Sequence, residues 1–125
     1  MPERMRGKSS PPRPQRLIVV LAQWCPHCVP LSVQNGKRMA QRLSIPLRIL
    51  DIDRRTQVKA ADRIVRQHGD WSPDYLIPQV FLEWSDGRTE HILTGFSERV
   101  PRTAQAWQDL FASDWFRAIP KGALR

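Results

Sequence analysis

Residues 16–22 (RLIVVLA) form a short, continuously apolar run, and this run constrains the possible folds most. It contains β-branched residues and does not alternate polar with apolar positions, which is typical of a strand buried on both faces of a sheet. Other layers must therefore cover both faces of that sheet. At 125 residues, the chain is long enough for one domain with one modest core.

The segments after this strand alternate between helical and strand-like patterns. Seven elements in the order β-α-β-α-β-β-α are predicted at residues 16–22, 26–43, 46–53, 56–68, 79–84, 89–94 and 101–112, with a further turn at 114–119. A helical crossover joins the first two strands, which should be parallel, whereas the last two flank a hairpin turn at 85–88. The predicted fold class is therefore α/β, with a mixed four-stranded sheet and helices on both faces.

Particular residues predict where the first two helices break, which side chains face inward and where the helix ends. The first helix carries apolar residues at helical spacing over 36–43, but Pro30 and the pair Asn35-Gly36 predict a kink or break. In the second helix, at 56–68, the residues that are expected to face inward include His68, and the helix is expected to end at Gly69.

Residues 1–15 are basic and proline-rich, and they hold almost nothing apolar to bury. Such a segment cannot recover the entropy lost on ordering, so a flexible tail is expected there. The predicted domain covers residues 16–119, with a C-terminal tail at 120–125. The tail is too polar for a secretory signal, and the apolar run at 17–22 is too short for a membrane span. We therefore expect a cytoplasmic monomer that does not bind a membrane.

The formal net charge is +8, with basic residues scattered along the chain. No nucleic-acid-binding motif accompanies them, and aromatic residues are not interleaved with them as a stacking surface requires. Specific nucleic-acid binding is therefore not expected. The positive charge is equally consistent with a substrate whose surface is anionic, or with weak non-specific adhesion to nucleic acid.

Cys25 and Cys28 are the only cysteines, and they are three positions apart. Two buried structural cysteines or half of a zinc site are alternatives, but zinc needs four ligands and no second pair at metal-binding spacing is present. A redox pair fits the position better, because Cys25 would lie at the start of a helix, where a thiolate is favoured. Cys28 could then attack a mixed disulfide on Cys25 and release the product.

The two residues between the cysteines are candidates for tuning this chemistry. Pro26 suits the first position of a helix. His27, if protonated, would place positive charge beside a Cys25 thiolate and make the disulfide more oxidising; the alternative is an exposed side chain with no role.

The segment Trp24-Cys25-Pro26-His27-Cys28 after a core strand resembles the active site of the thioredoxin superfamily, and the likeness covers the chain beyond the tail. The resemblance implies a thioredoxin-like fold and thiol–disulfide exchange with protein substrates, re-reduced by a reductase or thiol donor. It further implies that Pro78 is cis and faces Cys25. The substrate groove it implies is framed by Trp24, Pro26, Ile77, Pro78, Gly95 and Phe96.

The chain also departs from this family. Val19 and Ile49 stand where thioredoxins bury an acid and a nearby lysine, and residues 94–97 (TGFS) replace the element with which glutaredoxins grip glutathione. No cofactor beyond the Cys25–Cys28 disulfide is therefore expected, while glutathione-dependent activity stays open. A redox-sensitive adaptor module, which uses the tail to bind an acidic partner, is a second alternative.

Asp51 and Asp53 are expected to end a strand and cap the next helix rather than bind a cation. Trp71 and Tyr75 either contact substrate or anchor the loop before Pro78.

Overall fold

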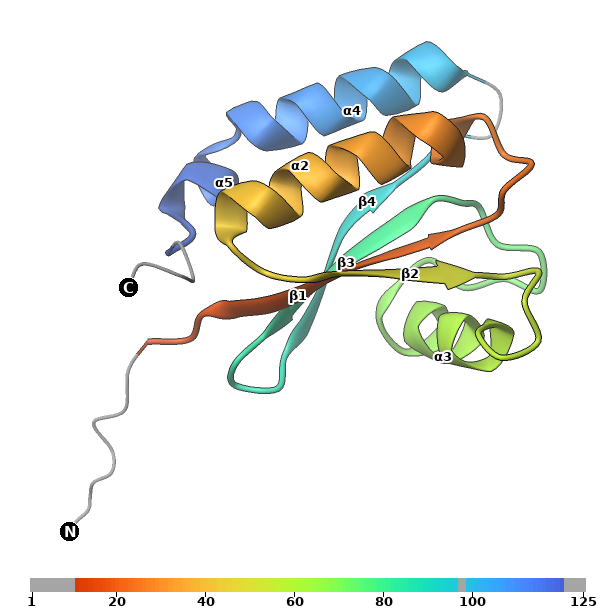
Figure 1. The fold of residues 1–125 in the computed structure, drawn as a ribbon, viewed down its shortest axis with the longest axis horizontal. Coiled ribbons are helices and arrows are strands. Elements are labelled where there is room, and N and C mark those ends of the chain that lie inside the picture. Colours follow the sequence, from red (N-terminus) through yellow and green to blue (C-terminus); the bar gives the residue numbers. More distant parts are fainter. Residues whose placement is uncertain (1–10, 97–98, 121–125) are drawn as a thin grey trace, which may run out of the picture.

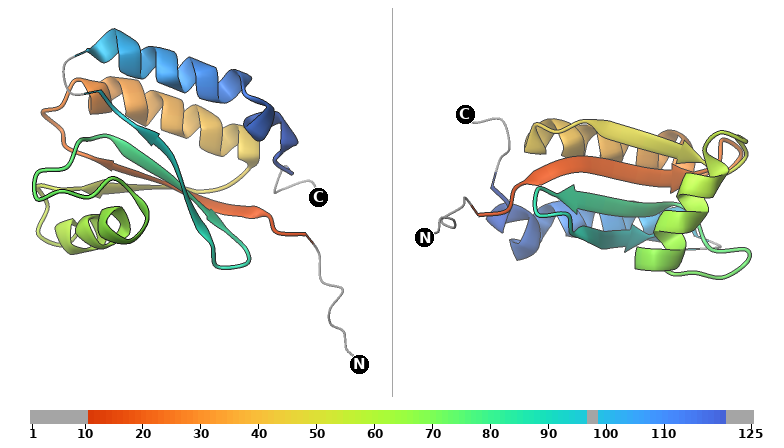
Figure 2. Two further views of the ribbon diagram at one scale, coloured as in Figure 1. Left: turned by 180° about the vertical axis from the view of Figure 1, so that it is seen from behind. Right: turned by 90° about the horizontal axis from the view of Figure 1, so that it is seen from below.

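A computed structural model of the chain describes residues 11–96 and 99–120. Its mixed four-stranded sheet has the order β2-β1-β3-β4 and carries helices on both faces (Figures 1 and 2). The strands are β1 (Pro14–Leu21), β2 (Leu47–Asp51), β3 (Gln79–Trp84) and β4 (Thr89–Thr94). The helical segments are η1 (His27–Ser32), α2 (Val33–Leu43), α3 (Val58–His68), α4 (Val100–Ala112) and α5 (Asp114–Ala118). The predicted α/β class and order of elements are confirmed.

β1 lies inside the sheet, parallel to β2 on one side and antiparallel to β3 on the other. The side chains of residues 17–21 are at most 2% exposed. The continuous apolar run is thus explained, because both faces of this strand are covered and both of its edges are paired. β3 and β4 form the predicted antiparallel hairpin, with Gly87 at φ 90° in the turn.

α2 and α4 lie side by side on one face of the sheet, and α3 covers the other (Figures 1 and 2). The inward face of α2 is as predicted, with Gly36, Met39, Ala40 and Leu43 buried. In α3 the inward prediction holds for Ala61 and Val65 but is wrong for His68, the last helical residue, which is exposed.

The first predicted helix is interrupted once. The break at Pro30 is confirmed, because Val29 adopts an extended backbone (φ −125°, ψ 123°) and regular helix begins only at Val33. No break occurs at Asn35-Gly36. The Asn35 side chain donates a hydrogen bond to Leu31 O, and Gly36 allows the helix to approach β1, since a Cβ there would lie 3.2 Å from Val19 Cγ2.

β1 begins two residues before the predicted boundary of the tail. Pro14 pairs with Trp84, and Ser85 exchanges two hydrogen bonds with the Arg13 backbone, at 2.8 and 2.9 Å. Arg16 is held to Glu83 by an ion pair of 2.8 Å. Residues 1–10 of the predicted tail and 121–125 of the predicted C-terminal tail lie outside the described residues.

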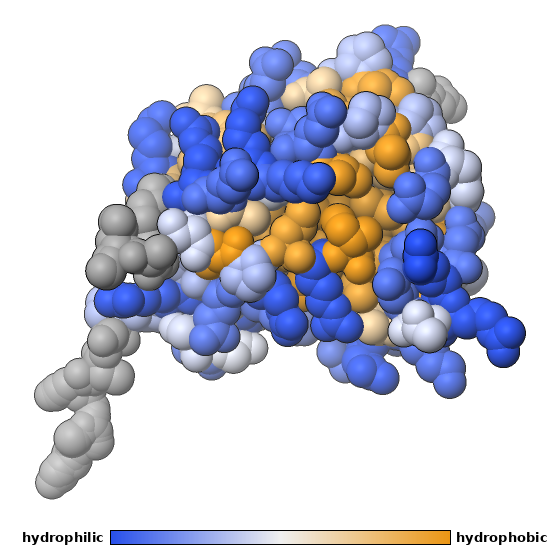
Figure 3. All heavy atoms as spheres, viewed as in Figure 1, coloured by the Kyte–Doolittle hydropathy of each residue, from blue (hydrophilic) through white to orange (hydrophobic). Residues whose placement is uncertain are grey.

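β2 is an edge strand, and Figure 3 shows apolar side chains gathered over the middle of this face of the molecule, between hydrophilic borders. The partly buried apolar residues of β2 and its flanks are Ile45, Leu47, Ile49 and Ile52. Among the helices of residues 11–96 and 99–120, none is both long and apolar enough to cross a bilayer.

Replacing Leu17 with alanine should lower the free energy of unfolding by about 2–5 kcal/mol, because methyl groups are removed from a fully buried position. Leu76, whose side chain is 44% exposed, is the matched control, and Leu76→Ala should change this free energy by less than about 0.5 kcal/mol. Urea denaturation of the reduced proteins measures both effects. If Leu17→Ala changed the free energy of unfolding as little as Leu76→Ala, β1 would not be the centre of the core.

Candidate active site

Cys25 and Cys28 lie in the segment that leads from β1 into η1. The Cys25 N–H donates to Ala22 O at 3.2 Å, and the N–H groups of Cys28 and Val29 both donate to Cys25 O at 3.0 Å. These bonds wrap the chain into a tight turn. Both cysteines are free thiols, and their side chains lie close enough to interact. The two residues singled out by spacing are therefore adjacent in space as a dithiol.

The two thiols differ in their surroundings. Cys25 is 4% exposed, whereas Cys28 is fully buried. Burial raises the pKa of the Cys28 thiol well above its ordinary value of 9.0, and the hydrogen bond with Cys25 and the negative charge of Asp51 raise it further. Cys28 is thus held as a protonated thiol behind Cys25.

Cys25 lies at the start of a helical segment, as expected, because its carbonyl oxygen accepts hydrogen bonds from the Cys28 and Val29 N–H groups, but this segment is short. Pro26 does adopt helical angles (φ −69°, ψ −22°), but η1 is broken at Val29 and α2 begins only at Val33. A proline within a helix removes a backbone donor and clashes with the preceding turn, which accounts for the interruption at Pro30. Regular helix therefore begins only beyond both cysteines, and the N–H of its first residue, Val33, donates to Cys28 O and Pro30 O.

Pro78 lies beside Cys25, as expected. The Ile77–Pro78 peptide bond is cis, and Cys25 Sγ lies 3.9 Å from Ile77 O. The Gly95 N–H donates to Pro78 O at 2.8 Å. A Cβ on Gly95 would lie only 2.5 Å from Pro78 Cδ, so this approach requires glycine. Three segments that are distant in sequence thus meet at Cys25.

His27 is buried at 6% exposure, which excludes the alternative of an exposed side chain. Its Nδ1 lies 2.7 Å from Thr103 Oγ1, and the Phe96 N–H donates to the same oxygen at 3.0 Å. Phe96 itself is 38% exposed, with the Arg102 guanidinium 4.7 Å from its ring centroid. The imidazole is therefore anchored to α4.

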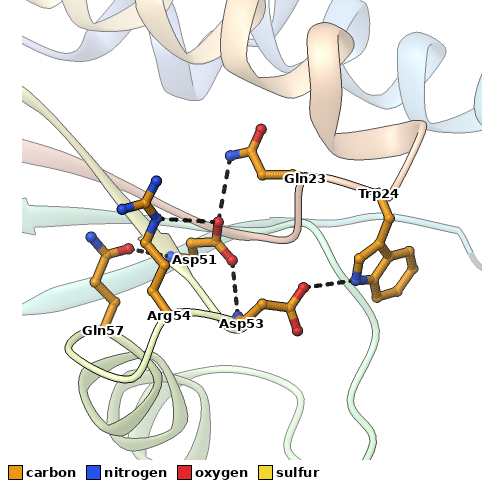
Figure 4. A network of polar contacts seen from close by, with 6 residues as sticks. All are labelled: Gln23, Trp24, Asp51, Asp53, Arg54 and Gln57. Carbon is orange, nitrogen blue, oxygen red and sulfur yellow. Dashed lines mark hydrogen bonds and ion pairs between the residues drawn. The ribbon is translucent and has the colours of Figure 1, made fainter.

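The residues just before Cys25 are held by two acids at the end of β2, which are Asp51, its last residue, and Asp53 (Figure 4). The Trp24 indole N–H donates to Asp53 Oδ2 at 2.8 Å, and Gln23 Nε2 lies 3.5 Å from Asp51 Oδ2. Asp51 is 3% exposed, and its other carboxylate oxygen accepts the Asp53 N–H at 2.9 Å. The indole of Trp24 remains 69% exposed, so its polar edge is fixed while its apolar surface faces solvent.

The two acids lie at the end of a strand, as expected, because Asp51 is the last residue of β2, but the expected helix cap is wrong. Gln57 precedes α3 without a side-chain cap, so neither Asp51 nor Asp53 caps that helix. Instead, Asp51 lies where the parallel strands β1 and β2 end together, opposite Leu21. Neighbouring parallel strands end at the same edge of a sheet. The acids at the end of β2 therefore lie near Gln23 and Trp24, which follow β1.

Trp71 and Tyr75 anchor their loop to α3. The Tyr75 hydroxyl donates to Asp62 at 2.8 Å, and the Arg66 guanidinium lies 4.2 Å from the Trp71 ring centroid. Burial and this hydrogen bond raise the pKa of Tyr75. Of the two roles considered for these residues, the contacts support anchoring.

Two participants were missed by sequence reasoning. Thr103 was not singled out, although a threonine on the apolar face of a helix is a signal for a buried hydrogen bond. Leu76, which is 44% exposed next to the Ile77–Pro78 bond, was also overlooked. No group of three or more histidine, cysteine or acidic side chains suited to a metal ion occurs in the described part of the chain.

The raised pKa of Cys28 predicts a pH dependence of stability. In the unfolded chain Cys28 ionises near 9.0, whereas in the folded protein it keeps its proton to higher pH. The free energy of unfolding of the reduced protein should therefore fall above about pH 9, by up to about 1.4 kcal/mol per pH unit from this group.

Urea denaturation under reducing conditions at about pH 8 and about pH 10 measures this loss, with Cys28→Ala as the control. The variant should lose less stability over the same interval. Equal losses in the two proteins would contradict the buried, protonated state of Cys28.

Comparison of this chain with protein-family models, with curated proteins and with solved structures found no match. Its chemistry must therefore be argued from its own residues. Those residues form a dithiol of unequally buried sulfurs, placed between the end of β1, a cis-proline turn and a histidine anchored to α4.

Proposed function

We propose that this protein is a thiol–disulfide oxidoreductase with a thioredoxin-like fold, acting through Cys25 and Cys28. The observation that carries the proposal is the contact between two thiols of unequal burial beside a cis-proline. Their position directly after the buried strand β1, in a mixed sheet of the predicted topology, supports the fold assignment.

The difference between the two thiols supports distinct roles. Cys25 is the more accessible, and its sulfur is in contact with a hydrogen-bonding neighbour, Cys28. The attacking sulfur in thiol–disulfide exchange must reach the substrate, whereas the resolving sulfur has only to reach its neighbour. Cys25 is therefore proposed as the nucleophile and Cys28 as the resolving cysteine.

In the reducing direction, the Cys25 thiolate attacks one sulfur of a substrate disulfide. A Cys25–substrate disulfide forms, the substrate S–S bond breaks, and the departing sulfur takes up a proton. Cys28 then gives up its proton and attacks Cys25 Sγ, which closes the Cys25–Cys28 disulfide and releases the second substrate sulfur as a thiol. Two electrons and two protons pass to the substrate, and the reverse sequence oxidises a substrate dithiol.

The surface around Cys25 supports a protein substrate. Exposed apolar side chains come from the three segments that meet there, namely Trp24, Leu76 and Phe96. Such side chains suit the apolar residues of an extended peptide, while the cis-Pro78 turn lies directly beside the proposed nucleophile.

The full-length protein should accelerate the reduction of insulin by dithiothreitol, and Cys25→Ser should reduce the rate to that of dithiothreitol alone, because the nucleophile is lost. Turbidity from the freed insulin chains measures the rate. The urea unfolding midpoint of the variant, compared with that of reduced wild type, serves as a control for folding. A correctly folded Cys25→Ser protein that retains the activity would overturn the proposed function.

Cys28→Ala should accumulate a mixed disulfide between Cys25 and substrate, since no second thiol is present to resolve it. Non-reducing electrophoresis after incubation with oxidised insulin would detect this species. The double variant Cys25→Ser/Cys28→Ala is the matched control and should form none. Equal trapping by the double variant would show that the adduct does not involve Cys25.

A further inference from the structure

α4 holds His27 at two points. Thr103 Oγ1 lies 2.7 Å from Nδ1 of the imidazole, while the His27 backbone carbonyl accepts a hydrogen bond from Ser32 Oγ at 2.6 Å. Ser32 Oγ in turn accepts from Trp107 Nε1 at 2.9 Å. Thr103 and Trp107 are fully buried and four residues apart, so they lie on the same face of α4. Both the ring and the backbone of His27 are therefore fixed by one helix.

The partners of Thr103 determine where its single hydroxyl proton goes. The Phe96 N–H can only donate, so Thr103 Oγ1 is the acceptor of that bond, at 3.0 Å. Within the described residues, the other partner of this oxygen is His27 Nδ1. The hydroxyl can donate its proton there if Nδ1 is an acceptor. If Nδ1 carried a hydrogen instead, the buried hydroxyl would accept twice, and both its own proton and the lone pair of Nε2 would lack a partner among the described residues, whereas the other tautomer leaves only the Nε2 hydrogen without one.

A neutral imidazole whose Nδ1 accepts a hydrogen bond carries its hydrogen on Nε2. Nε2 has no hydrogen-bond partner within residues 11–96 and 99–120, although the side chain is only 6% exposed. The structure thus leaves one N–H donor unused on a buried ring between the two cysteines of the pair.

We infer that Thr103 is a positioning residue that fixes His27 as its Nε2–H tautomer, so that His27 presents a neutral N–H donor to a sulfur or carbonyl group of the bound substrate. The tautomer follows from the contacts of Thr103, whereas the consequence for substrate rests on the proposed function. Because the same hydroxyl also binds the Phe96 backbone, one residue of α4 aligns His27 with an exposed aromatic side chain of the proposed substrate surface.

The tautomer can be observed without any activity. Long-range ¹H–¹⁵N correlation spectra of the reduced full-length protein at about pH 8, where an unperturbed imidazole is neutral, distinguish a protonated from an unprotonated ring nitrogen. The chain has three histidines, and the signal lost in His27→Ala assigns His27. Protonated Nε2 and unprotonated Nδ1 are expected. A hydrogen on Nδ1 would overturn the inference, whether or not the protein exchanges disulfides.

Substitution of Thr103 tests its role. Thr103→Ser keeps the hydroxyl. It should preserve both the His27 tautomer and the rate at which Cys25 forms a mixed disulfide with oxidised insulin in the Cys28→Ala protein. Thr103→Val keeps the shape but removes the hydroxyl; it should abolish the tautomer preference and slow mixed-disulfide formation by about 2- to 10-fold, as expected for one hydrogen bond. An unchanged tautomer in Thr103→Val would refute the role of the hydroxyl.

The His27→Ala background separates His27 from the Phe96 contact. If Thr103 acts through His27, adding Thr103→Val to His27→Ala should cause no further slowing. An equal slowing in both backgrounds would assign the effect to the Phe96 backbone and overturn the inference. Failure of the proposed function would instead appear as activity that survives Cys25→Ser.

Discussion

The pairing of β1 with a strand on each side is the constraint on which the rest of the structure depends. Its residues 17–21 are at most 2% exposed, and they fix the direction in which the chain leaves the sheet. As a result, Gln23 and Trp24 lie beside the two acids at the end of β2, and Cys25 lies beside the Ile77–Pro78 turn before β3. The position of the dithiol is therefore a consequence of sheet order.

The chemistry of the dithiol depends on a small difference in depth. Cys25 is 4% exposed and Cys28 is fully buried, and desolvation of a charged form is the largest cause of the raised pKa of Cys28. The buried carboxylate of Asp51 adds to this effect, since it opposes a second negative charge nearby. The raised pKa keeps Cys28 protonated in the folded protein, which suits the resolving role proposed for it.

Polar contacts between distant parts of the chain hold the surroundings of this pair. Asp53 fixes the polar edge of Trp24, and Thr103 fixes the ring of His27. In the proposed function, the face of Trp24 and Nε2 of His27 are the surfaces left for a substrate to contact. Ser32 and Trp107 extend the buried network by holding the backbone of His27, since Ser32 donates to its carbonyl and accepts from the Trp107 indole.

The sequence by itself determined the elements and the spacing of the cysteines. The apolar run at 16–22 required a buried strand, helical periodicity set the inward face of α2, and the turn at 85–88 set the hairpin. These features are local, so periodicity and turn chemistry were sufficient to predict them. The break at Pro30 was predictable for the same reason, because a proline inside a helix removes a backbone donor and clashes with the preceding turn.

Only the tertiary structure decided the partners of the site. The His27–Thr103 contact spans 76 positions and the Trp24–Asp53 contact 29, distances over which no local pattern operates. The acids were misassigned as helix caps for the same reason, since their role appears only when β2 lies beside β1. Proton affinity was likewise beyond the sequence, because it depends on how deeply each sulfur is buried and which charges surround it.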